Sequence, residues 1–192
     1  MTELDAWLEA VVATPGLTAL GDLLEARRVL VEDSLRALDI LKTTEGPIVD
    51  VGSGGGAPGI PLAFALPERE VVLLEASGRK CEFLRRWAPP NARVVQGRAE
   101  EQENDWAGVA TAKALAPPPV AAEWCLPLVR SGGLVVLYVG PSVDPDHVAR
   151  VGEKLNAELG ESPDGLLVLR KLGPTPSGFP RRTGVARKRP LA

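Results

Sequence analysis

The chain has 192 residues, of which 45% are hydrophobic and 24% are charged. These values are typical of a single globular domain that buries an apolar core. No apolar run approaches the ~20 residues needed to cross a bilayer, and the N-terminus lacks the apolar segment of a signal peptide. The single histidine, His147, excludes a metal site built from several histidines, and we expect it at an exposed helix start. The sequence thus predicts a cytoplasmic protein with no metal and no membrane association, and it implies no oligomer.

The formal net charge of −3 is unevenly distributed along the chain. Residues 165–192 hold seven of the 22 basic residues and no acid, so the rest of the chain carries 15 basic against 25 acidic residues. An acidic body with a basic end indicates a polyanionic partner that is contacted at one end only. Cys81 and Cys125 lack the spacing of a metal site and are expected to be reduced thiols.

The first 45 residues predict helices. Apolar residues from Leu4 to Val12 recur at helical spacing, which predicts a short amphipathic helix over 3–13. A second apolar series, which includes Leu24, predicts one or two further helices up to about Leu41. We interpret residues 1–45 as a helical cap over one edge of a sheet.

From residue 46 onward, the pattern alternates between strands and helices. Strands are expected at 47–51, 70–75, 92–96, 107–112, 133–139 and 165–171, and helices near 58–66, 78–87, 117–129 and 144–158. Because these strands show little polar alternation, helices should cover both faces of a mostly parallel, doubly wound sheet. Residues 46–172 therefore predict one Rossmann-like α/β domain. Residues 173–192, with several prolines and glycines, predict an extended basic tail that does not pack.

A glycine-rich loop follows the first predicted strand. Residues 47–59 are P-I-V-D-V-G-S-G-G-G-A-P-G, an apolar run that ends in Asp50 and passes through glycines into a helix. Glycines let a ligand approach the backbone, and the first N–H groups of the helix face the loop. The acid two residues before the first glycine favours S-adenosylmethionine (SAM) over NAD. The spacing G-x-G-x-x-G, formed by Gly54, Gly56 and Gly59, also fits a dinucleotide.

Two later loops complete the predicted cofactor site. Glu75 ends the second strand, where an acid accepts hydrogen bonds from ribose hydroxyls. Residues 98–101, R-A-E-E, follow the third strand. Ala99 and Glu100 are expected to touch an adenine ring, and the alternative for this segment is an exposed acidic helix start.

The loop after the fourth strand carries the clue to the acceptor. Its sequence, T-A-K-A-L-A-P-P-P, lacks the Asn or Asp that would recognise an amino acceptor, and the Cys needed for covalent attack on a pyrimidine. Its only ionisable group is Lys113. We expect Lys113 to pair with Asp50 or a nearby acid, or to bind a phosphate of the substrate.

Taken together, these segments resemble the RsmG family of rRNA guanine-N7 methyltransferases, also called glucose-inhibited division protein B. The resemblance lies in residues 49–63 and 73–85, in R-A-E-E and K-A-L-A-P, in E-D-S-L at 32–35, and in the basic residues 173–191. It implies a class I SAM-dependent methyltransferase fold with a small N-terminal helical cap. It also implies SAM as the cofactor and 16S rRNA, free or in the small ribosomal subunit, as the substrate.

The resemblance places SAM-binding positions of the family at Gly52, Ala57, Ala99, Glu100 and Lys113. The residues predicted to bind the cofactor, including the loop residue Ser53, are Asp50, Gly52, Ser53, Gly54, Gly56, Ala57, Glu75, Ala99, Glu100 and Lys113. Three positions depart from the family pattern. Ala57 replaces a bulky apolar residue and should loosen one wall of the cofactor pocket, Lys113 replaces an arginine, and Val31 replaces a histidine. Residues 157–164 are also too few for the usual sixth strand.

The predicted acceptor suits the absence of a base in these loops. Guanine N7 carries an in-plane lone pair and no proton, so methyl transfer depends on alignment and no obligatory general base is expected. Lys113 is a candidate for positioning. The residues predicted to bind RNA phosphates are Arg181, Arg182, Arg187, Lys188 and Arg189.

Other interpretations of the sequence remain open. The basic tail could instead dock on the acidic body. A small-molecule methyltransferase and a SAM-binding family member without activity share the same motifs, and an NAD enzyme is the least supported alternative.

Overall fold

One seven-stranded sheet organises the protein. The computed structural model describes residues 2–192. The strands lie in the order β3-β2-β1-β4-β5-β7-β6. Their bounds are β1 Ile48–Val51, β2 Val71–Glu75, β3 Ala92–Gln96, β4 Ala107–Lys113, β5 Val129–Tyr138, β6 Ala157–Leu159 and β7 Leu166–Lys171. Strands β1 to β5 pair in parallel, and β7 runs antiparallel to both β5 and β6. The predicted mostly parallel, doubly wound sheet is confirmed.

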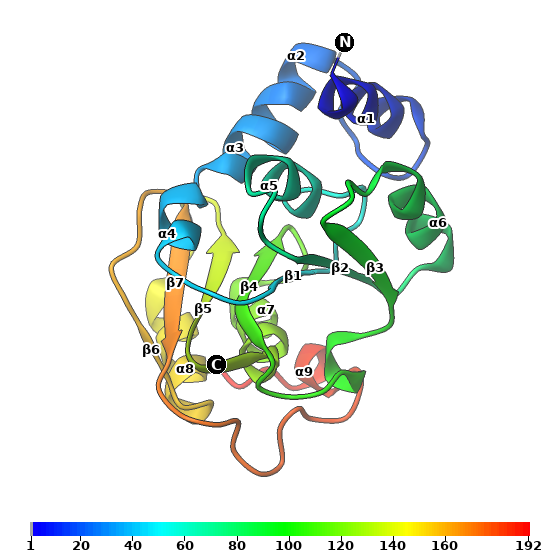
Figure 1. Cartoon of the computed structure of the whole chain (residues 1–192). Helices are drawn as coiled ribbons and strands as arrows, with labels where there is room; N and C mark the ends of the chain where they lie inside the picture. The colour runs from blue at the N-terminus through cyan, green and yellow to red at the C-terminus, as the bar shows by residue number, and fades with distance from the viewer. Residues whose placement is uncertain (1) are drawn as a thin grey trace.

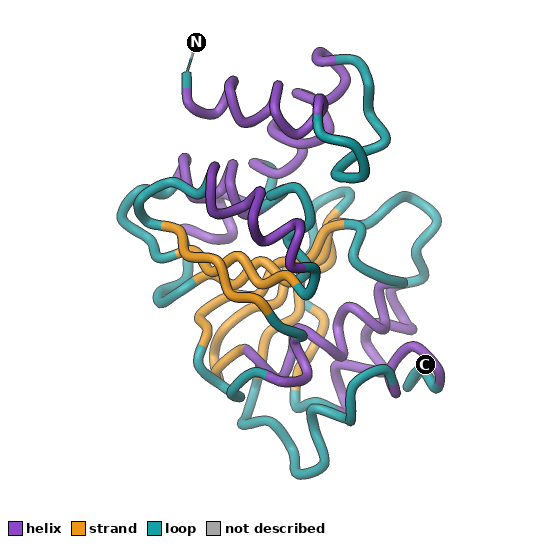
Figure 2. Tube along the Cα trace, turned by 90° about the vertical axis from the view of Figure 1, so that its right-hand side faces the viewer, coloured by secondary structure: helices purple, strands orange, loops and turns teal. Residues whose placement is uncertain are grey.

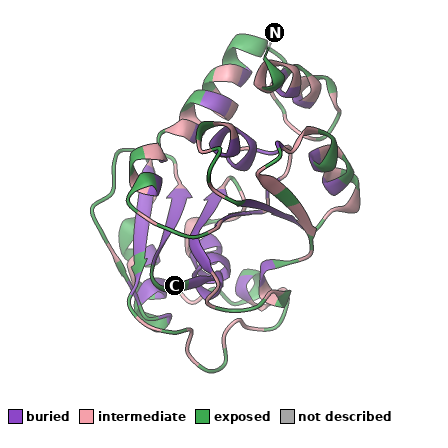
Figure 3. Ribbon diagram, in the orientation of Figure 1, coloured by how far each residue is buried: buried purple, intermediate pink, exposed green. Residues whose placement is uncertain are grey.

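Helices cover both faces of the sheet (Figures 1 and 2). Side chains of each strand alternate between the two faces, so that Val49, Val51 and Leu74 pack on one side and Ile48 and Leu73 on the other. The first side is covered by α7 (Pro118–Cys125), α8 (Pro145–Lys154) and α9 (Val185–Lys188). The second side is covered by the N-terminal helices, α5 (Gly59–Ala65) and α6 (Gly78–Trp87). Buried residues are concentrated along the strands between these layers (Figure 3).

The N-terminal region folds into helices, as predicted. Helix α1 (Glu3–Ala13) starts with a capping box between Thr2 and Asp5. A continuous helical stretch follows as α2 (Leu23–Ala26), the π-helix η1 (Arg27–Glu32) and α3 (Asp33–Leu35), and α4 (Leu38–Lys42) comes next. Leu24, which the apolar series places on the inner face, is instead 80% exposed. Helices α1, α2 and α3 lie above α5 in Figure 1. The fully buried Trp7 of α1 donates its indole N–H to the carbonyl of Gly55 (2.9 Å). The first helix is thereby tied to the glycine loop.

The prediction that residues 157–164 leave no room for a sixth strand is wrong. Residues Ala157–Leu159 form β6, which pairs with β7 at the sheet edge. Three residues suffice because α8 ends at Lys154, four residues earlier than expected. His147 lies in the first turn of α8 with a half-exposed side chain, as predicted. Both cysteines are free and buried.

The prediction of an unpacked tail is also wrong. Residues 173–192, here the C-terminal segment, include α9 and run back along the body. Ala186 is 2% exposed within the core cluster beneath α7. The buried ammonium of Lys171 donates to Asp105 (3.1 Å) and Thr175 (2.9 Å), which fixes the start of the segment. The burial of Ala186, the hydrogen bonds of Thr175 to Asp105 and the ion pair of Arg181 with Glu123 therefore hold a segment whose composition alone indicates an extended chain.

The helices of residues 2–192 include none long and apolar enough to cross a membrane.

Candidate active site

Asp50 supports the glycine loop from beneath. Its carboxylate is 1% exposed and accepts a hydrogen bond from the backbone N–H of Gly59 (3.1 Å), the first residue of α5. Burial, reinforced by the nearby Glu75 charge, raises the pKa of Asp50 to about 7, although hydrogen bonds partly oppose this rise. The hydroxyl of Ser53 donates to the Asp50 carbonyl (2.9 Å). Asp50 thus fixes the turn between strand and helix from the interior.

Gly52 begins the loop at a position that only glycine fits well. Its φ is +72°, and a Cβ there would lie 2.3 Å from Cδ1 of Leu115. The loop after β4 therefore packs directly against the Gly52 backbone, and a side chain would fill the space between them.

Glu75 ties the glycine loop to the end of β2. Its carboxylate accepts from the backbone N–H groups of Gly54 (2.9 Å) and Ser77 (2.8 Å), and the side chain is 8% exposed. Each carboxylate oxygen can accept more than one hydrogen bond, so acceptor capacity remains toward the solvent side. A buried, oriented acid at this position suits a pair of ribose hydroxyls.

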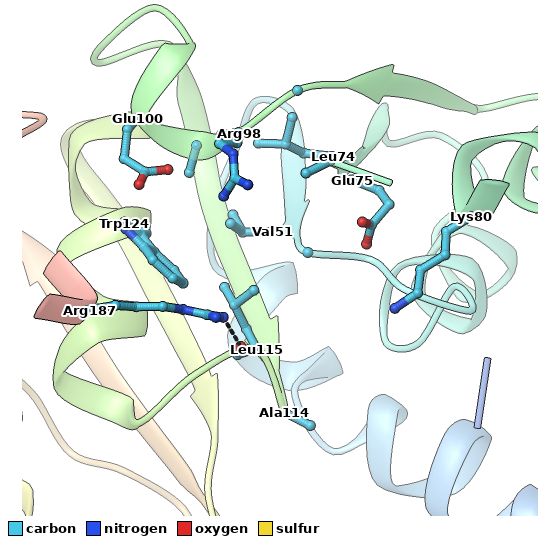
Figure 4. Close-up of a pocket in the computed structure, with 14 residues that line it drawn as sticks. Val51, Leu74, Glu75, Lys80, Arg98, Glu100, Ala114, Leu115, Trp124 and Arg187 are labelled. Atoms are coloured by element: carbon cyan, nitrogen blue, oxygen red, sulfur yellow. Dashed lines mark hydrogen bonds between the residues drawn. The ribbon is translucent and has the colours of Figure 1, made fainter. Parts of the chain in front are cut away.

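The first cavity lies at the carboxyl ends of β1 to β4, where the ligands of doubly wound sheets bind (Figure 4). It encloses about 260 Å³. Figure 4 shows Glu75 and Lys80 on one side, and Glu100, Trp124 and Arg187 together on the other. Between the two groups lie the apolar Val51, Leu74 and Leu115 and the charged Arg98. The cavity thus offers polar groups along its length and apolar surfaces beside them, as an elongated ligand with a flat apolar part requires.

A second cavity of about 350 Å³ adjoins the first. The two share Gly52, Lys80 and Ala114 in their linings. The second cavity lies between the glycine loop and the N-terminal helices, and its apolar walls include Trp7, Val11, Leu17, Leu20 and Leu30. The helical cap therefore forms one side of a chamber that is continuous with the first cavity.

Lys113 faces the second cavity and is held firmly. Its ammonium donates to the carbonyl of Val29 (2.9 Å) and to the carboxylate of Asp33 (2.6 Å). Although partial burial opposes the shift, hydrogen bonds from Lys113 and Arg36 lower the pKa of Asp33. Of the partners expected for Lys113, the structure selects a nearby acid other than Asp50.

The residues predicted for the cofactor fall into three groups. Four line the first cavity, namely Gly52, Glu75, Ala99 and Glu100. Five line the second, namely Gly52, Ser53, Gly54, Ala57 and Lys113. Asp50 and Gly56 line neither; a Cβ on Gly56 would lie 2.5 Å from Ile60, so this glycine permits close packing. Ala57 thus widens the second cavity, whereas the sequence placed it in the cofactor pocket.

The basic residues predicted to bind RNA also separate. Arg181 forms a bidentate ion pair with the buried carboxylate of Glu123. Arg187 lies over the ring of Trp124 and lines the first cavity. Arg182, Lys188 and Arg189 are exposed, as Arg187 is, but they do not line the first cavity. Arg181 and Arg187 therefore contact the body of the protein, which agrees with the alternative that the basic tail docks on it.

Several residues that line the first cavity were not predicted from the sequence. Lys80, Arg98 and Leu115 lie within the segments that resemble the family, and Trp124 lies on α7. Lys80 and Arg98 could have been predicted from their positions shortly after the ends of β2 and β3. Trp124 and Arg187 carry no such signal because tertiary packing alone brings them to the cavity.

The residues present fit SAM. Glu75 offers acceptors for the ribose, and Gly52 provides a surface that a Cβ would fill. Among the lining residues of the first cavity, Val51, Leu74 and Leu115 are apolar and Trp124 is aromatic, which offers surfaces for a purine ring. Among residues 2–192, no three His, Cys, Asp or Glu side chains gather in a way that could hold a metal ion.

Comparison with known proteins agrees with this geometry. The family model GidB, described as rRNA small subunit methyltransferase G, matches residues 3–156. The chain belongs to this family. Ribosomal RNA small subunit methyltransferase G of Rubrobacter xylanophilus is 37% identical over an alignment 203 residues long, gaps included. The alignment covers 92% of this chain and 74% of that protein. The protein of the same name from Synechococcus elongatus is 34% identical and covers 91% of this chain and 82% of its own.

Solved structures support the fold of this GidB-family chain. The antibiotic-resistance methyltransferase Kmr has a TM-score of 0.53 at 16% identity and covers 73% of this chain and 93% of its own. A TehB-like SAM-dependent methyltransferase from Corynebacterium glutamicum has a TM-score of 0.56 at 19% identity and covers 72% of this chain and 87% of its own. The predicted family, the class I methyltransferase fold and the SAM-dependent enzyme class are confirmed.

Proposed function

We propose that this enzyme transfers the methyl group of SAM to N7 of a guanine in 16S rRNA of the small ribosomal subunit. SAM occupies the first cavity and supplies an electrophilic methyl group. The target base enters the second cavity, so that methyl donor and acceptor meet at the junction lined by Gly52, Lys80 and Ala114. A base buried there would be shielded from water by Trp7 and the other apolar residues of the cap.

The observation that carries this proposal is the chemistry of the second cavity. The ionisable side chains in its lining are Lys80 and Lys113, and the lining contains no Asp, Glu or His. An amino, hydroxyl or ring-carbon acceptor must lose a proton, which requires a nearby base. Guanine N7 has no proton to lose. The transfer then rests on alignment, which can contribute about 7–11 kcal/mol in well-oriented reactions.

Lys113 is suited to hold the guanine. Two of its three ammonium donors are engaged by Val29 and Asp33, and the side chain lines the cavity. A remaining N–H can donate to guanine O6, the acceptor beside N7 that lysines contact in nucleic-acid recognition. Lys113 would then fix the plane of the base and direct N7 toward the methyl group.

The exposed basic residues supply the contacts to the RNA backbone in this proposal. Arg182, Lys188 and Arg189 are exposed on the C-terminal segment, where they can neutralise phosphates and make binding salt-dependent. A ribosomal substrate also implies a cytoplasmic enzyme.

Methyl transfer from labelled SAM to small ribosomal subunits that lack N7-methylguanine tests the proposal. Labelled 7-methylguanosine in the digested rRNA is the expected product. Label in another nucleoside would show that the acceptor is not guanine N7. If no label appears although SAM binds, the proposal is wrong, and the protein either methylates another substrate or has no methyltransferase activity. The rate should not fall as the pH is lowered from 8 to 6, because no base has to be ionised; a tenfold loss per pH unit would refute base-free transfer.

A further inference from the structure

The C-terminal segment reaches the cofactor site. Its residues are anchored to the body beside the first cavity at several points. The N–H of Gly184 donates to Glu100 (3.2 Å), and the hydroxyl of Thr183 donates to Glu101 (3.3 Å). Arg181 is held by the buried Glu123, and Ala186 is buried beneath α7. These contacts fix the short helix α9 at one end of the cavity.

Arg187 extends from α9 over the cavity. Its guanidinium carbon lies 5.2 Å from the ring centroid of Trp124, and Nη2 donates to the carbonyl of Leu115 (3.4 Å). Figure 4 shows Arg187 beside Trp124, on the same side of the cavity as Glu100, with a dashed line from its guanidinium to the adjacent Leu115. The flat indole and the flat guanidinium therefore build one wall together, from segments 63 positions apart.

We propose that Arg187 and Trp124 form the wall that holds the adenine of SAM, and that Arg187 is a cofactor-binding residue. This inference rests on the proposed use of SAM by the first cavity. The orientation of the ligand follows from Glu75, whose carboxylate suits the ribose, and from Gly52 at the junction where the methyl group must lie. The adenine then extends away from both, toward Ala99, Glu100 and the wall.

The chemistry of the wall fits a purine. A guanidinium stacks on aromatic faces and donates hydrogen bonds in its own plane, and its charge is permanent. Adenine presents both a π face and ring nitrogens that accept hydrogen bonds. A lysine in the same place would keep the charge but lose the planar surface. Arg187 acts on the cofactor because it lines the cavity; Arg182 and Lys188 are exposed as Arg187 is, but lie outside the cavity lining.

Calorimetric binding without RNA tests this role. The ligands are S-adenosylhomocysteine, which has the whole SAM framework, and 5′-methylthioadenosine, which lacks the amino-acid part. Because Arg187 is exposed, we expect Arg187→Ala to weaken both ligands by the same factor of about five, in keeping with a cation–π contact of ~1 kcal/mol. Arg187→Lys should lose part of that affinity. Arg182→Ala and Lys188→Ala are matched controls that remove one nearby charge each and should change neither ligand more than twofold.

Each outcome decides between distinct ideas. Unchanged affinity of Arg187→Ala for both ligands, with thermal unfolding as in the wild type, would overturn the inference. Weaker binding of S-adenosylhomocysteine alone would overturn the adenine assignment, because Arg187 would then act on the amino-acid part. If Arg187→Ala lowers the unfolding temperature, the same comparison of the two ligands is made with Arg187→Lys, which keeps the charge. Unchanged affinity of that variant for both ligands would then overturn the inference. A wild-type protein that binds neither ligand would overturn the proposed use of SAM, and this inference with it.

Discussion

Replacing Gly52 by alanine should narrow the first cavity and also destabilise the fold. At φ +72°, alanine costs about 1–2 kcal/mol of backbone strain. Its Cβ would lie 2.3 Å from Cδ1 of Leu115, the far end of a flexible side chain, so Leu115 must rotate at a further ~0.5–1.5 kcal/mol. The expected loss in unfolding free energy is thus ~1.5–3.5 kcal/mol. Since Gly52 and Leu115 both line the first cavity, S-adenosylhomocysteine affinity should fall at least about tenfold.

A second glycine provides the control for this prediction. Gly132 has φ +82°, and a Cβ there would meet no atom within 4 Å. Gly132→Ala should therefore show the backbone strain alone, about 1–2 kcal/mol by urea unfolding, with unchanged ligand affinity. Adding Leu115→Ala to Gly52→Ala should restore part of the lost affinity. If Gly52→Ala matches Gly132→Ala in both measurements, the close approach of Gly52 and Leu115 does not shape the cavity, and the reasoning fails.

Three further predictions concern other parts of the site and the core. Lys113→Met should lower the rate of methyl transfer to rRNA at least about tenfold, while the affinity for S-adenosylhomocysteine, measured by calorimetry, changes less than about threefold. This difference is expected for a side chain that lines the second cavity. Equal losses of rate and affinity would indicate that Lys113 acts on the cofactor instead. Asp50 titrates at about 7 in the folded chain and near 3.9 in the unfolded chain, so the folded state holds an extra proton between these values and stability falls as the pH rises through that window, by up to ~4 kcal/mol. Asp50→Asn should remove this slope in urea unfolding from pH 4 to 8, and parallel wild-type and variant curves would contradict it. Lys171→Ala removes a fully buried ammonium and leaves Asp105 without its ion pair, which should cost ~3–5 kcal/mol in urea unfolding, whereas Arg170→Ala, at an exposed neighbour, should cost under ~1 kcal/mol.

Much of the fold was predictable because its signals are local. Runs such as 70–75 and 92–96 carry enough apolar or β-branched residues to mark a strand, and β3 matches its expected bounds. The strand at residues 157–159 was not predicted, because a strand of three residues with the exposed Glu158 at its centre has no recognisable local pattern. It is defined by its pairing with β7. The exposure of Leu24 likewise depends on which helices pack above it, not on its spacing.

The site was predictable where it follows strand ends. Gly52, Glu75 and Ala99 line the first cavity because the carboxyl ends of parallel strands meet at one edge of the sheet. Lys113 also ends a strand, β4, but its side chain turns toward Asp33 of the cap, a partner 80 positions away. Arg187 was grouped with the RNA-binding residues on charge alone. The stacking on Trp124 that places it in the cavity wall arises only when the C-terminal segment docks.

The wall of the first cavity has a consequence for how the enzyme matures. Arg187 is synthesised about 135 positions after Gly52, and between them come all strands of the sheet except β1. A nascent chain can therefore assemble the sheet before the segment that completes the cavity exists. Contacts so distant in sequence form late, because a long loop must close before they contribute. Ligand capture would then report the final docking step of folding, and a refolding trace followed by ligand binding should lag behind one followed by the formation of the sheet.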